Sequence, residues 1–429
     1  MAEETPTGLT RIVRALPGEL KPVLLSFGYF FFVLACYYVL RPVRDEMGIR
    51  GGVRNLPWLF TGTFVSSLVI APIYAALVAR LRRSVFIPSV YGFLILNIVA
   101  FWALLTAGAY AAQTAMVFFV WITVFSVFAV SVFWSFMADL YTSDQAKRLY
   151  PFIAAGGALG GFAGSATVTG LAKVIGPSNL LIVAAVLLGL ALACAMGLEK
   201  TPIAKGPAKR KTDPAAGVGG GWLSGVVTIL KSPYLGGIAL WVFLLSLANT
   251  FAYYMQAQVI SDANLDSASR TQIFGAIDLA ANVLIPLTQL LITGFLLKRV
   301  GIGPTLAIVA AVAAAGFLAL AAMPVLAVVI AVQVAYRAGS FALSNPAREA
   351  LWPVVDRADK YKTKNVVDNV VFRGGDVANS WIYNALSATA GLGTAAIALI
   401  GAAVSAGWIV VSIALGRAQA AKAKAQTPA

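Results

Sequence analysis

Residues 179–197 read NLLIVAAVLLGLALACAMG, without a single charged side chain. This length matches the roughly 20 apolar residues that a helix needs to cross a bilayer. Eleven other segments have a similar length and character, namely 23–40, 58–79, 85–107, 113–138, 149–172, 234–257, 272–297, 303–321, 324–345, 364–388 and 393–415. We therefore predict an all-α polytopic membrane protein with twelve transmembrane helices and no room for a soluble domain.

The overall composition supports this class. Of the 429 residues, 60% are hydrophobic and 11% are charged, whereas soluble domains are about 45–50% apolar and about 25% charged. The 32 basic residues outnumber the 17 acidic ones, which gives a net charge of +15. If the N-terminus is cytoplasmic, 24 of the 32 basic residues lie in cytoplasmic segments, six lie outside, and Arg337 and Arg373 lie within helices. The positive-inside rule then predicts that both termini are cytoplasmic, and the charge indicates topology rather than nucleic-acid binding. We expect the protein to lie in a bacterial inner membrane.

The longest interruption between apolar segments is 199–233. It contains the basic run Lys205–Lys211 and the glycine-rich run Gly217–Gly221, a composition typical of a flexible cytoplasmic linker. Six apolar segments precede it and six follow, so we predict an N-terminal half at 1–198 and a C-terminal half at 234–429. Two six-helix halves with such a linker are the plan of the major facilitator architecture. The alternative is a twelve-span protein of another fold.

Residues that could serve catalysis or metal binding are scarce. The chain has no histidine, and Cys36 and Cys194 both lie in apolar segments, where packing is their expected role. The glycines Gly156, Gly160 and Gly164 follow a small-xxx-small spacing that favours close helix packing over a phosphate-binding loop. No nucleophile–base pair or nucleotide-hydrolysis motif is present. We expect no enzyme, no cofactor and no metal site.

The eleventh apolar segment carries several charges. Residues 366–381 read VVDNVVFRGGDVANSW and include Asp368, Arg373 and Asp376. Each such charge costs about 2.5–3.5 kcal/mol at the centre of a membrane helix on translocon-insertion scales. Charges retained at that cost usually face a water-filled path, so this segment predicts a transport site.

Polar side chains recur at helical spacing on five of the predicted spans, which predicts a cavity near the midplane between the two halves. The aligned residues are Tyr37, Arg41, Arg44 and Asp45 in the first span; Asn249, Tyr253 and Gln256, with Tyr254 beside them, in the seventh; Asp278, Asn282 and Gln289 in the eighth; Gln333, Arg337, Ser340 and Ser344 in the tenth; and Asn365, Asp368, Asn369, Phe372, Arg373, Asp376, Asn379 and Tyr383 in the eleventh. The alternative is that the charges only pair with one another, as Arg373 with Asp376 or Arg337 with Asp278.

The signs of these charges favour an anionic substrate, because guanidinium groups bind carboxylates and phosphates in two-point geometry. We assign substrate binding to Tyr37, Arg41, Arg44, Asn249, Tyr253, Arg337 and Arg373. The tyrosines Tyr37, Tyr38, Tyr253 and Tyr254 could also stack on a planar ring. We assign charge balance or proton coupling to Asp45, Asp278, Asp368 and Asp376.

Three motifs resemble the nucleotide transporter family, the ATP:ADP antiporters of plastids and intracellular bacteria. The run Leu40–Asp45 resembles the Leu-Arg-x-x-Lys-Asp at the end of the family's first helix. Phe133–Phe136 with Asp144–Pro151 resembles its Phe-Trp and Glu-Ala-Lys-Arg-Phe-Tyr-Pro runs. Lys360–Asp368, continuing to Arg373–Gly375, resembles its Lys-x-Lys-x-x-x-Asp and its basic, glycine-rich eleventh helix.

The resemblance implies ATP:ADP exchange or nucleotide–proton symport, with Arg44 and Arg373 facing the phosphates. Several positions depart from the family pattern. Arg44 replaces a lysine, Asp144 is displaced by one position, and Asp376 stands where a small or hydroxyl residue is expected. The chain is also shorter than the nucleotide exchangers.

We therefore predict a monomeric secondary transporter that works by alternating access on a nucleotide or another phosphorylated anion. Two alternatives remain open. One is a proton-coupled carrier or exporter of another small organic compound, for which Asp278 and Asp376 would carry the protons. The other is a sensor or assembly factor without transport, in which Lys205–Lys211 would dock a protein partner or anionic lipid.

Overall fold

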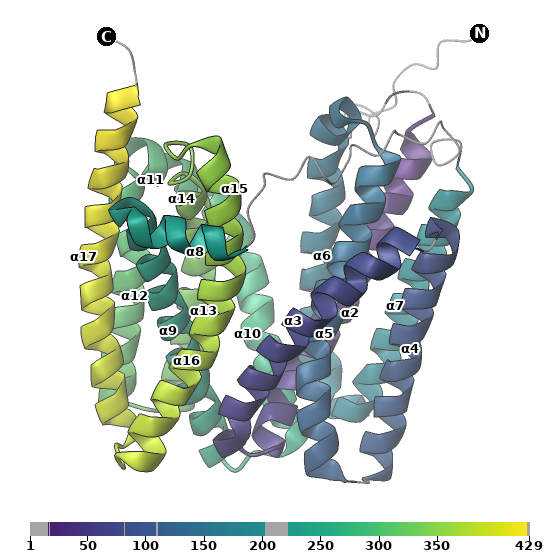
Figure 1. Ribbon diagram of the computed structural model, residues 1–429. Coiled ribbons are helices and arrows are strands. Elements are labelled where there is room, and N and C mark those ends of the chain that lie inside the picture. The colour runs from purple at the N-terminus through teal and green to yellow at the C-terminus, as the bar shows by residue number, and fades with distance from the viewer. Residues whose placement is uncertain (1–15, 17, 81, 109, 202–221, 427–429) are drawn as a thin grey trace. The chain divides into compact units, whose positions relative to one another are not determined.

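The computed structural model describes residues 16, 18–80, 82–108, 110–201 and 222–426, and these residues fold into helices without strands (Figure 1). The helices are α2 (Leu20–Arg50), η1 (Val53–Asn55), α3 (Leu56–Arg80), α4 (Arg83–Ala107), α5 (Ala111–Leu140), α6 (Ser143–Ile175), α7 (Pro177–Glu199), α8 (Trp222–Lys231), α9 (Pro233–Asp262), α10 (Ser267–Thr288), η3 (Gln289–Thr293), α11 (Gly294–Arg299), α12 (Ile302–Ala322), α13 (Leu326–Gly339), η4 (Ser340–Ser344), α14 (Asn345–Glu349), α15 (Arg357–Asn365), η5 (Val366–Val371), α16 (Phe372–Asn384), η6 (Ala385–Thr389) and α17 (Thr394–Gln426).

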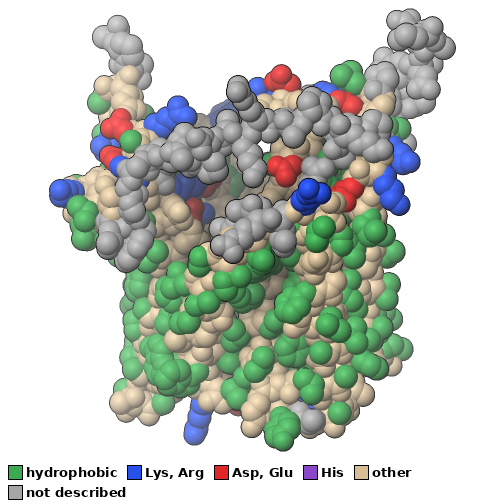
Figure 2. Space-filling model, turned by 45° about the vertical axis from the view of Figure 1, so that its right-hand side comes forward, with side chains coloured by type: hydrophobic (Ala, Val, Ile, Leu, Met, Phe, Trp, Pro, Cys, Tyr) green, Lys and Arg blue, Asp and Glu red, His purple; other side chains and the backbone are tan. Residues whose placement is uncertain are grey.

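The predicted all-α membrane fold is confirmed. Each of the twelve predicted segments coincides with a helix or with a run of consecutive helices. Within the described residues, ten helices are long and apolar enough to cross a membrane; the predicted second and eleventh spans are helical but are not among these ten. Hydrophobic side chains are spread over the middle and lower parts of the face seen in Figure 2, where few charged side chains are in view.

Helix ends follow local chemistry. The Thr142 hydroxyl accepts a hydrogen bond from the Gln145 amide, and the Gln145 side chain accepts one from the Thr142 amide, which forms a capping box at the start of α6. Gly176, with φ of +80°, separates α6 from α7, and Pro177 occupies the first turn of α7. The Ser232 hydroxyl accepts from the Leu235 amide and begins α9.

The helices divide into two compact units. Unit 1 comprises residues 1–52, 65–211 and 266–279, and unit 2 comprises 53–64, 212–265 and 280–429. The start of α10 therefore belongs to unit 1, and η1 with the start of α3 belongs to unit 2. The predicted halves at 1–198 and 234–429 stay a prediction. Within the predicted linker, residues 222–231 form helix α8, whereas Lys205–Lys211 and Gly217–Gly221 lie outside the described residues.

In unit 1, α2 packs against α5, α6 and α7. A Cβ atom built on Gly156 would lie 2.6 Å from the Phe27 carbonyl oxygen, and one on Gly160 would overlap the carbonyl of Phe31. These glycines therefore let the α2 and α6 backbones meet, as the small-xxx-small spacing predicts.

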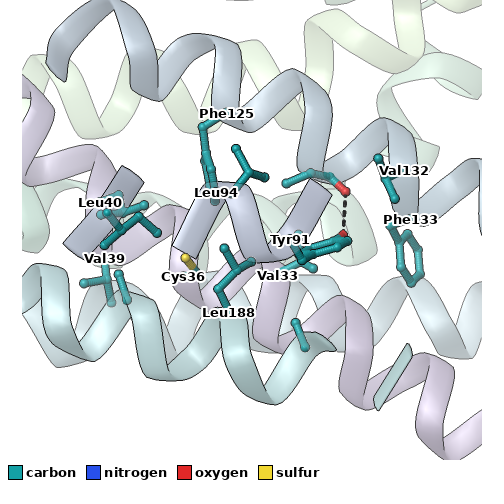
Figure 3. Close-up of a cluster of buried hydrophobic side chains, with 14 of the residues drawn as sticks. Val33, Cys36, Val39, Leu40, Tyr91, Leu94, Phe125, Val132, Phe133 and Leu188 are labelled. Carbon is teal, nitrogen blue, oxygen red and sulfur yellow. Dashed lines mark hydrogen bonds between the residues drawn. The ribbon is translucent and has the colours of Figure 1, made fainter. Parts of the chain in front are cut away.

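Cys36, which is fully buried, packs in the apolar core of unit 1 among residues of four helices (Figure 3). Its neighbours in that view include Val33, Leu94, Phe125 and Leu188. The packing role expected of Cys36 agrees with this environment. The hydroxyl of Tyr91, in the same core, accepts a hydrogen bond of 2.6 Å from Tyr29 and donates one of 3.1 Å to the Ala129 carbonyl.

In unit 2, α9 packs against α16 and α17, and α12 packs along α17. The indole of Trp241 lies 5.4 Å from that of Trp408 between ring centroids and donates a 2.9 Å hydrogen bond to the Ser412 hydroxyl. The phenol of Tyr234 donates to the Leu351 carbonyl at 2.7 Å. These contacts join α9 to α17 and to the turn at Leu351, while α9 also packs against α16.

Candidate polar clusters

The first polar cluster, here called the ion-pair cluster, lies in unit 1. It consists of residues on the second half of α2 and the first turns of α10, namely Arg41, Arg44, Asp45, Glu46, Arg270 and Asp278. Its three carboxylates are almost completely buried, with exposed side-chain fractions of 1% for Asp45, 0% for Glu46 and 2% for Asp278. A buried carboxylate is tolerated only when it is paired or hydrogen-bonded.

Each of these carboxylates has an arginine beside it. Arg270 donates two hydrogen bonds to Glu46, from Nε at 2.7 Å and from Nη2 at 2.8 Å. Arg44 donates to Asp45 at 2.6 Å, and Arg41 lies 3.6 Å from Asp278. The two-point geometry of the Arg270–Glu46 pair makes it the strongest of the three.

Aromatic rings complete the surroundings of the arginines on α2. The guanidinium carbon of Arg44 lies 5.0 Å from the centre of the Phe119 ring, and that of Arg41 lies 5.9 Å from the Tyr38 ring. Tyr37 contacts Tyr38 edge to face at 5.4 Å. A ring face attracts a cation, so these contacts hold Arg44 against α5 and Arg41 along α2.

The start of α10 is fixed to α6 as well as to α2. Gln272 donates a 2.8 Å hydrogen bond to the Thr169 carbonyl, and a Cβ atom on Gly275 would lie 2.8 Å from the Val168 side chain. The ion pairs with Glu46 and Asp278 therefore reinforce a contact that packing already makes.

The second polar cluster, here called the hydroxyl cluster, lies in unit 2 between α9 and α16. It consists of Ser246 and Thr250, four residues apart on α9, and Asp376 and Asn379, three apart on α16. The Ser246 hydroxyl donates a 2.7 Å hydrogen bond to Asp376 and accepts one of 3.3 Å from the Asn379 amide. Thr250 and Arg373 are the other polar neighbours of the Asp376 carboxylate.

Glycine sets the distance between the helices of this cluster. A Cβ atom on Gly375 would lie 3.0 Å from the Ser246 hydroxyl oxygen, which is tighter than ordinary packing. One turn further along, Tyr254 and Ser380 form a 2.5 Å hydrogen bond between their hydroxyls. The side-chain hydrogen bonds between α9 and α16 thus follow one another along the two helices, and Asp376 supplies the carboxylate among them.

The tyrosines of α9 do not offer free ring faces in this conformation. Tyr254 is 3% exposed and packs between Phe60, at 6.1 Å, and Tyr383, at 4.5 Å between ring centroids. Tyr253 is 9% exposed and contacts the edge of Phe60 at 5.8 Å. The expectation that both rings can stack on a substrate does not hold here, because the start of α3 covers them.

The prediction that the polar residues of the eleventh span share one helical face is wrong. A π-helical turn, η5, occupies Val366–Val371, and its wider turn shifts the helical register relative to α16. Asp376, Asn379 and Tyr383 are buried, whereas Asn365 and Asn369 are exposed. Phe372, Arg373 and Asp368 are half-buried.

Asp368 and Lys364 are held outside the hydroxyl cluster. The carboxylate of Asp368 lies 3.3 Å from Arg348, and Lys364 donates a 2.5 Å hydrogen bond to Glu349. Both partners belong to α14, the short helix that follows the π-helical segment η4. The Lys360–Asp368 motif therefore joins α14 to the start of the α15–α16 run, and this contact gives Asp368 a structural partner.

The remaining predicted residues are distributed over both units. On α13, Gln333 donates to the Ala252 carbonyl at 2.9 Å, and Arg337 is 9% exposed. Asn249 is exposed, whereas Gln256 is fully buried and neither of its amide atoms has a hydrogen-bond partner among the described residues. Gln289 donates to the Phe341 carbonyl at 3.3 Å. Asn282 and Ser344 are half-buried and buried, respectively.

The second sequence motif, Phe133–Phe136 with Asp144–Pro151, includes residues at the start of α6 that bind Glu19. Arg148 donates two hydrogen bonds, at 2.8 and 2.9 Å, to Glu19, and Gln145 donates a third at 2.9 Å. Burial alone would raise the pKa of Glu19, but these bonds and one from the Leu16 amide outweigh it, so the pKa lies below its ordinary value. In the same motif, Phe133 stacks on Phe30 at 4.3 Å between ring centroids. These residues hold helices together.

Sequence reasoning missed four residues of the two clusters. Ser246 and Thr250 were overlooked although their i,i+4 spacing within an apolar segment places two hydroxyls on one face. Glu46 and Arg270 were overlooked because each lies near the end of a predicted span, where charges are common.

No protein-family model matches the chain, and no curated protein matches it in sequence. Solved structures do match it. A POT family transporter in complex with 5-aminolevulinic acid aligns with a TM-score of 0.66 and 12% identity, over 95% of this chain and 98% of that chain.

Two other solved transporters align over a similar share. A bacterial homologue of the human lysosomal transporter Spinster gives a TM-score of 0.57 at 13% identity, over 97% of this chain and all of that chain (100%). The nucleoside transporter NupG gives 0.61 at 13% identity, over 94% and 99%. At this identity the likeness establishes the fold, and it confirms the major-facilitator-like architecture expected from the sequence.

Proposed function

We propose that this chain is a secondary transporter that works by alternating access and that its substrate is a nucleotide or another phosphorylated anion. The apolar helices support a membrane location, and the solved structures that share the fold are transporters. The three sequence motifs support ATP:ADP exchange as the specific form of this function. We further propose a bacterial inner-membrane location with both termini cytoplasmic, and a monomer.

The observation that carries the proposal is the state of Arg373. Its side chain is half-buried on the first turn of α16, within the predicted eleventh span and next to the hydroxyl cluster. In the described part of the chain, Arg373 forms neither a hydrogen bond nor an ion pair within 4.0 Å, and Asp376 is its electrostatic neighbour. An arginine kept at this cost without a close partner is suited to an anion that arrives from solution.

The arginines of α2 support the same substrate class in a different way. Arg41 and Arg44 are already beside Asp278 and Asp45. Phosphate and carboxylate groups present similar oxygen geometry to a guanidinium, so a phosphate can replace a carboxylate as the partner. We propose that Asp45 and Asp278 balance these charges when no substrate is bound, and that Tyr37, Asn249, Tyr253 and Arg337 contribute further contacts.

Transport by reconstituted protein tests this proposal. Proteoliposomes are loaded with ADP, and uptake of labelled ATP, GTP and inorganic phosphate is compared with uptake by protein-free liposomes. We expect uptake of at least one of these anions, and faster uptake with ADP inside than without it. If none of the three labelled anions enters, the proposed substrate class is wrong.

A second candidate function is a proton-coupled carrier of another small organic compound. The observation that favours it is Asp376, a carboxylate that is 8% exposed and held by a hydroxyl rather than by an arginine. Asp376→Asn should then abolish transport driven by a pH gradient while exchange of unlabelled for labelled substrate continues. Transport that does not respond to an imposed pH gradient would contradict this candidate.

A further inference from the structure

The hydroxyl cluster contains a buried oxygen atom that lacks a partner. Thr250 and Asn379 are fully buried, and within the described residues Asn379 Oδ1 has no hydrogen-bond partner, whereas the Thr250 hydroxyl faces the Asp376 carboxylate. A buried polar atom without a partner costs about 1–3 kcal/mol. Both side chains flank the Asp376 carboxylate, because Thr250 neighbours it and Asn379 shares Ser246 with it.

The cluster therefore offers four kinds of side-chain oxygen around one position. A carboxylate comes from Asp376, hydroxyls come from Ser246 and Thr250, and an amide carbonyl comes from Asn379. Oxygen atoms of these types are the ligands that hard cations prefer. The two helices are close enough for such a site because Gly375 has no side chain to separate Ser246 from α16.

The charge of the cluster selects the class of cation. One carboxylate with three neutral oxygens cancels one positive charge, whereas a divalent ion would leave an uncompensated charge in a buried place next to Arg373. We propose that Ser246, Thr250, Asp376 and Asn379 form a binding site for a monovalent metal cation, and that this cation is Na⁺.

The charged and titratable groups around Asp376 indicate how the site would respond to substrate. Arg373, on the same helix, and Tyr336, on α13, are its electrostatic neighbours, and the phenol of Tyr336 already donates to the Leu245 carbonyl at 3.1 Å. Arg373 therefore opposes a second positive charge at Asp376. An anion bound to Arg373 removes that opposition, so the anion and Na⁺ favour each other's binding.

This coupling role rests on the proposed function, but the ion site itself does not. Na⁺ binding can therefore be measured on the protein without any substrate. Its failure and the failure of the proposed transport activity are distinguishable, because one is a binding measurement and the other is an uptake measurement.

The test is the melting temperature of the purified full-length protein in detergent, with NaCl replaced by KCl or by choline chloride at constant ionic strength. A ligand that binds the folded state raises the melting temperature. We expect 100 mM NaCl to raise it by about 3 °C or more over choline, with a smaller effect of KCl. Asp376→Asn and Thr250→Val should both lose this shift, and Arg373→Gln should reach half of the full shift at a lower Na⁺ concentration.

The matched control is Asp262→Asn, which removes an exposed carboxylate from α9 and should retain the shift. Thr250→Val keeps the shape of the side chain and removes only the oxygen, so it tests the site even if Asp376→Asn fails to fold. A shift of equal size in NaCl, KCl and choline chloride at both pH 6 and pH 8 would overturn the proposal, as would an unchanged Na⁺ shift in Thr250→Val. A Na⁺ shift without uptake of any phosphorylated anion would leave the site in place and remove the proposed substrate.

Discussion

The two polar clusters differ in the groups that compensate their buried carboxylates. In the ion-pair cluster of unit 1, the carboxylates of Asp45, Glu46 and Asp278 each lie beside an arginine. In the hydroxyl cluster of unit 2, Asp376 accepts a hydrogen bond from Ser246, and Arg373 forms no close ion pair in the described part of the chain. A cluster whose charges are already matched holds helices together and can bind an anion only in exchange for a carboxylate, whereas a cluster with an unpartnered buried oxygen and a guanidinium without a close ion pair is suited to a ligand.

The largest predicted effect is the loss of the Arg270–Glu46 pair. Arg270→Gln leaves the fully buried Glu46 carboxylate without its two hydrogen bonds. Breaking a buried pair typically costs about 3–5 kcal/mol, because one charge stays uncompensated. The free energy of unfolding in detergent should fall by this amount. Arg50→Gln, at an exposed arginine on α2, is the control and should change the free energy of unfolding by less than about 0.5 kcal/mol. Equal effects of the two changes would show that the Arg270–Glu46 pair does not stabilise the fold.

The second largest effect on stability is expected at the contact between Gly160 of α6 and Phe31 of α2. Gly160→Ala places a methyl group against the Phe31 carbonyl, so α2 and α6 must separate. Overpacking of this kind costs about 1–3 kcal/mol. Gly170→Ala on the same helix meets no atom within 4 Å and should instead stabilise the helix by up to about 1 kcal/mol. Thermal unfolding of the two variants should therefore shift in opposite directions, and a shift in the same direction would contradict the close packing.

The hydrogen bonds from Arg148 and Gln145 to Glu19 give a smaller effect on stability that depends on pH. The pKa of Glu19 lies below its ordinary value in the folded protein, so the ionised form contributes stability above the ordinary pKa of about 4.3. That contribution is lost as the pH falls through the lowered pKa. Glu19→Gln should therefore cost about 1 kcal/mol at pH 7, and the difference between variant and wild type should shrink below about pH 4. Melting temperatures of variant and wild type at pH 7 and below pH 4 check this. A difference in melting temperature that grows on acidification would contradict the lowered pKa of Glu19.

The smallest effect on stability is expected for Asp376→Asn. The change removes a buried charge and keeps the shape and a hydrogen-bonding oxygen, so the free energy of unfolding should change by less than about 1 kcal/mol. The contrast with Arg270→Gln is the direct comparison of the two clusters. A loss as large as that of Arg270→Gln would mean that Asp376 is also a structural charge.

The helices were largely predictable from the sequence because their apolar segments are long and their caps are local. The capping box of Thr142 and Gln145 and the Gly176–Pro177 boundary use neighbouring residues alone. Helix α8 was not expected, because its ten residues lie beside a glycine-rich and basic run that is typical of a linker.

The polar site was predictable only in part. The spacing of Arg373, Asp376 and Asn379 correctly placed them on one helix, and Asp376 with Asn379 contributes to the hydroxyl cluster. Asp368 and Asn369 were placed on the same face in error, because the π-helical turn at Val366–Val371 depends on packing against other helices rather than on a local signal. The partners of Asp376 and Glu46 come from distant parts of the chain, at Ser246 and Arg270, which spacing within one helix cannot identify.

The most direct test of the claim that Arg373, beside the hydroxyl cluster, binds the substrate anion is the rate of ATP uptake into ADP-loaded proteoliposomes by two arginine variants of unit 2. Arg373→Gln removes the unpaired guanidinium beside the hydroxyl cluster, and Arg417→Gln removes an exposed arginine on α17. If Arg373 binds the anion, uptake by Arg373→Gln should fall at least about tenfold, since a charge-assisted hydrogen bond contributes about 1.5–3 kcal/mol, and uptake by Arg417→Gln should match the wild type. Equal uptake by the two variants would contradict the account.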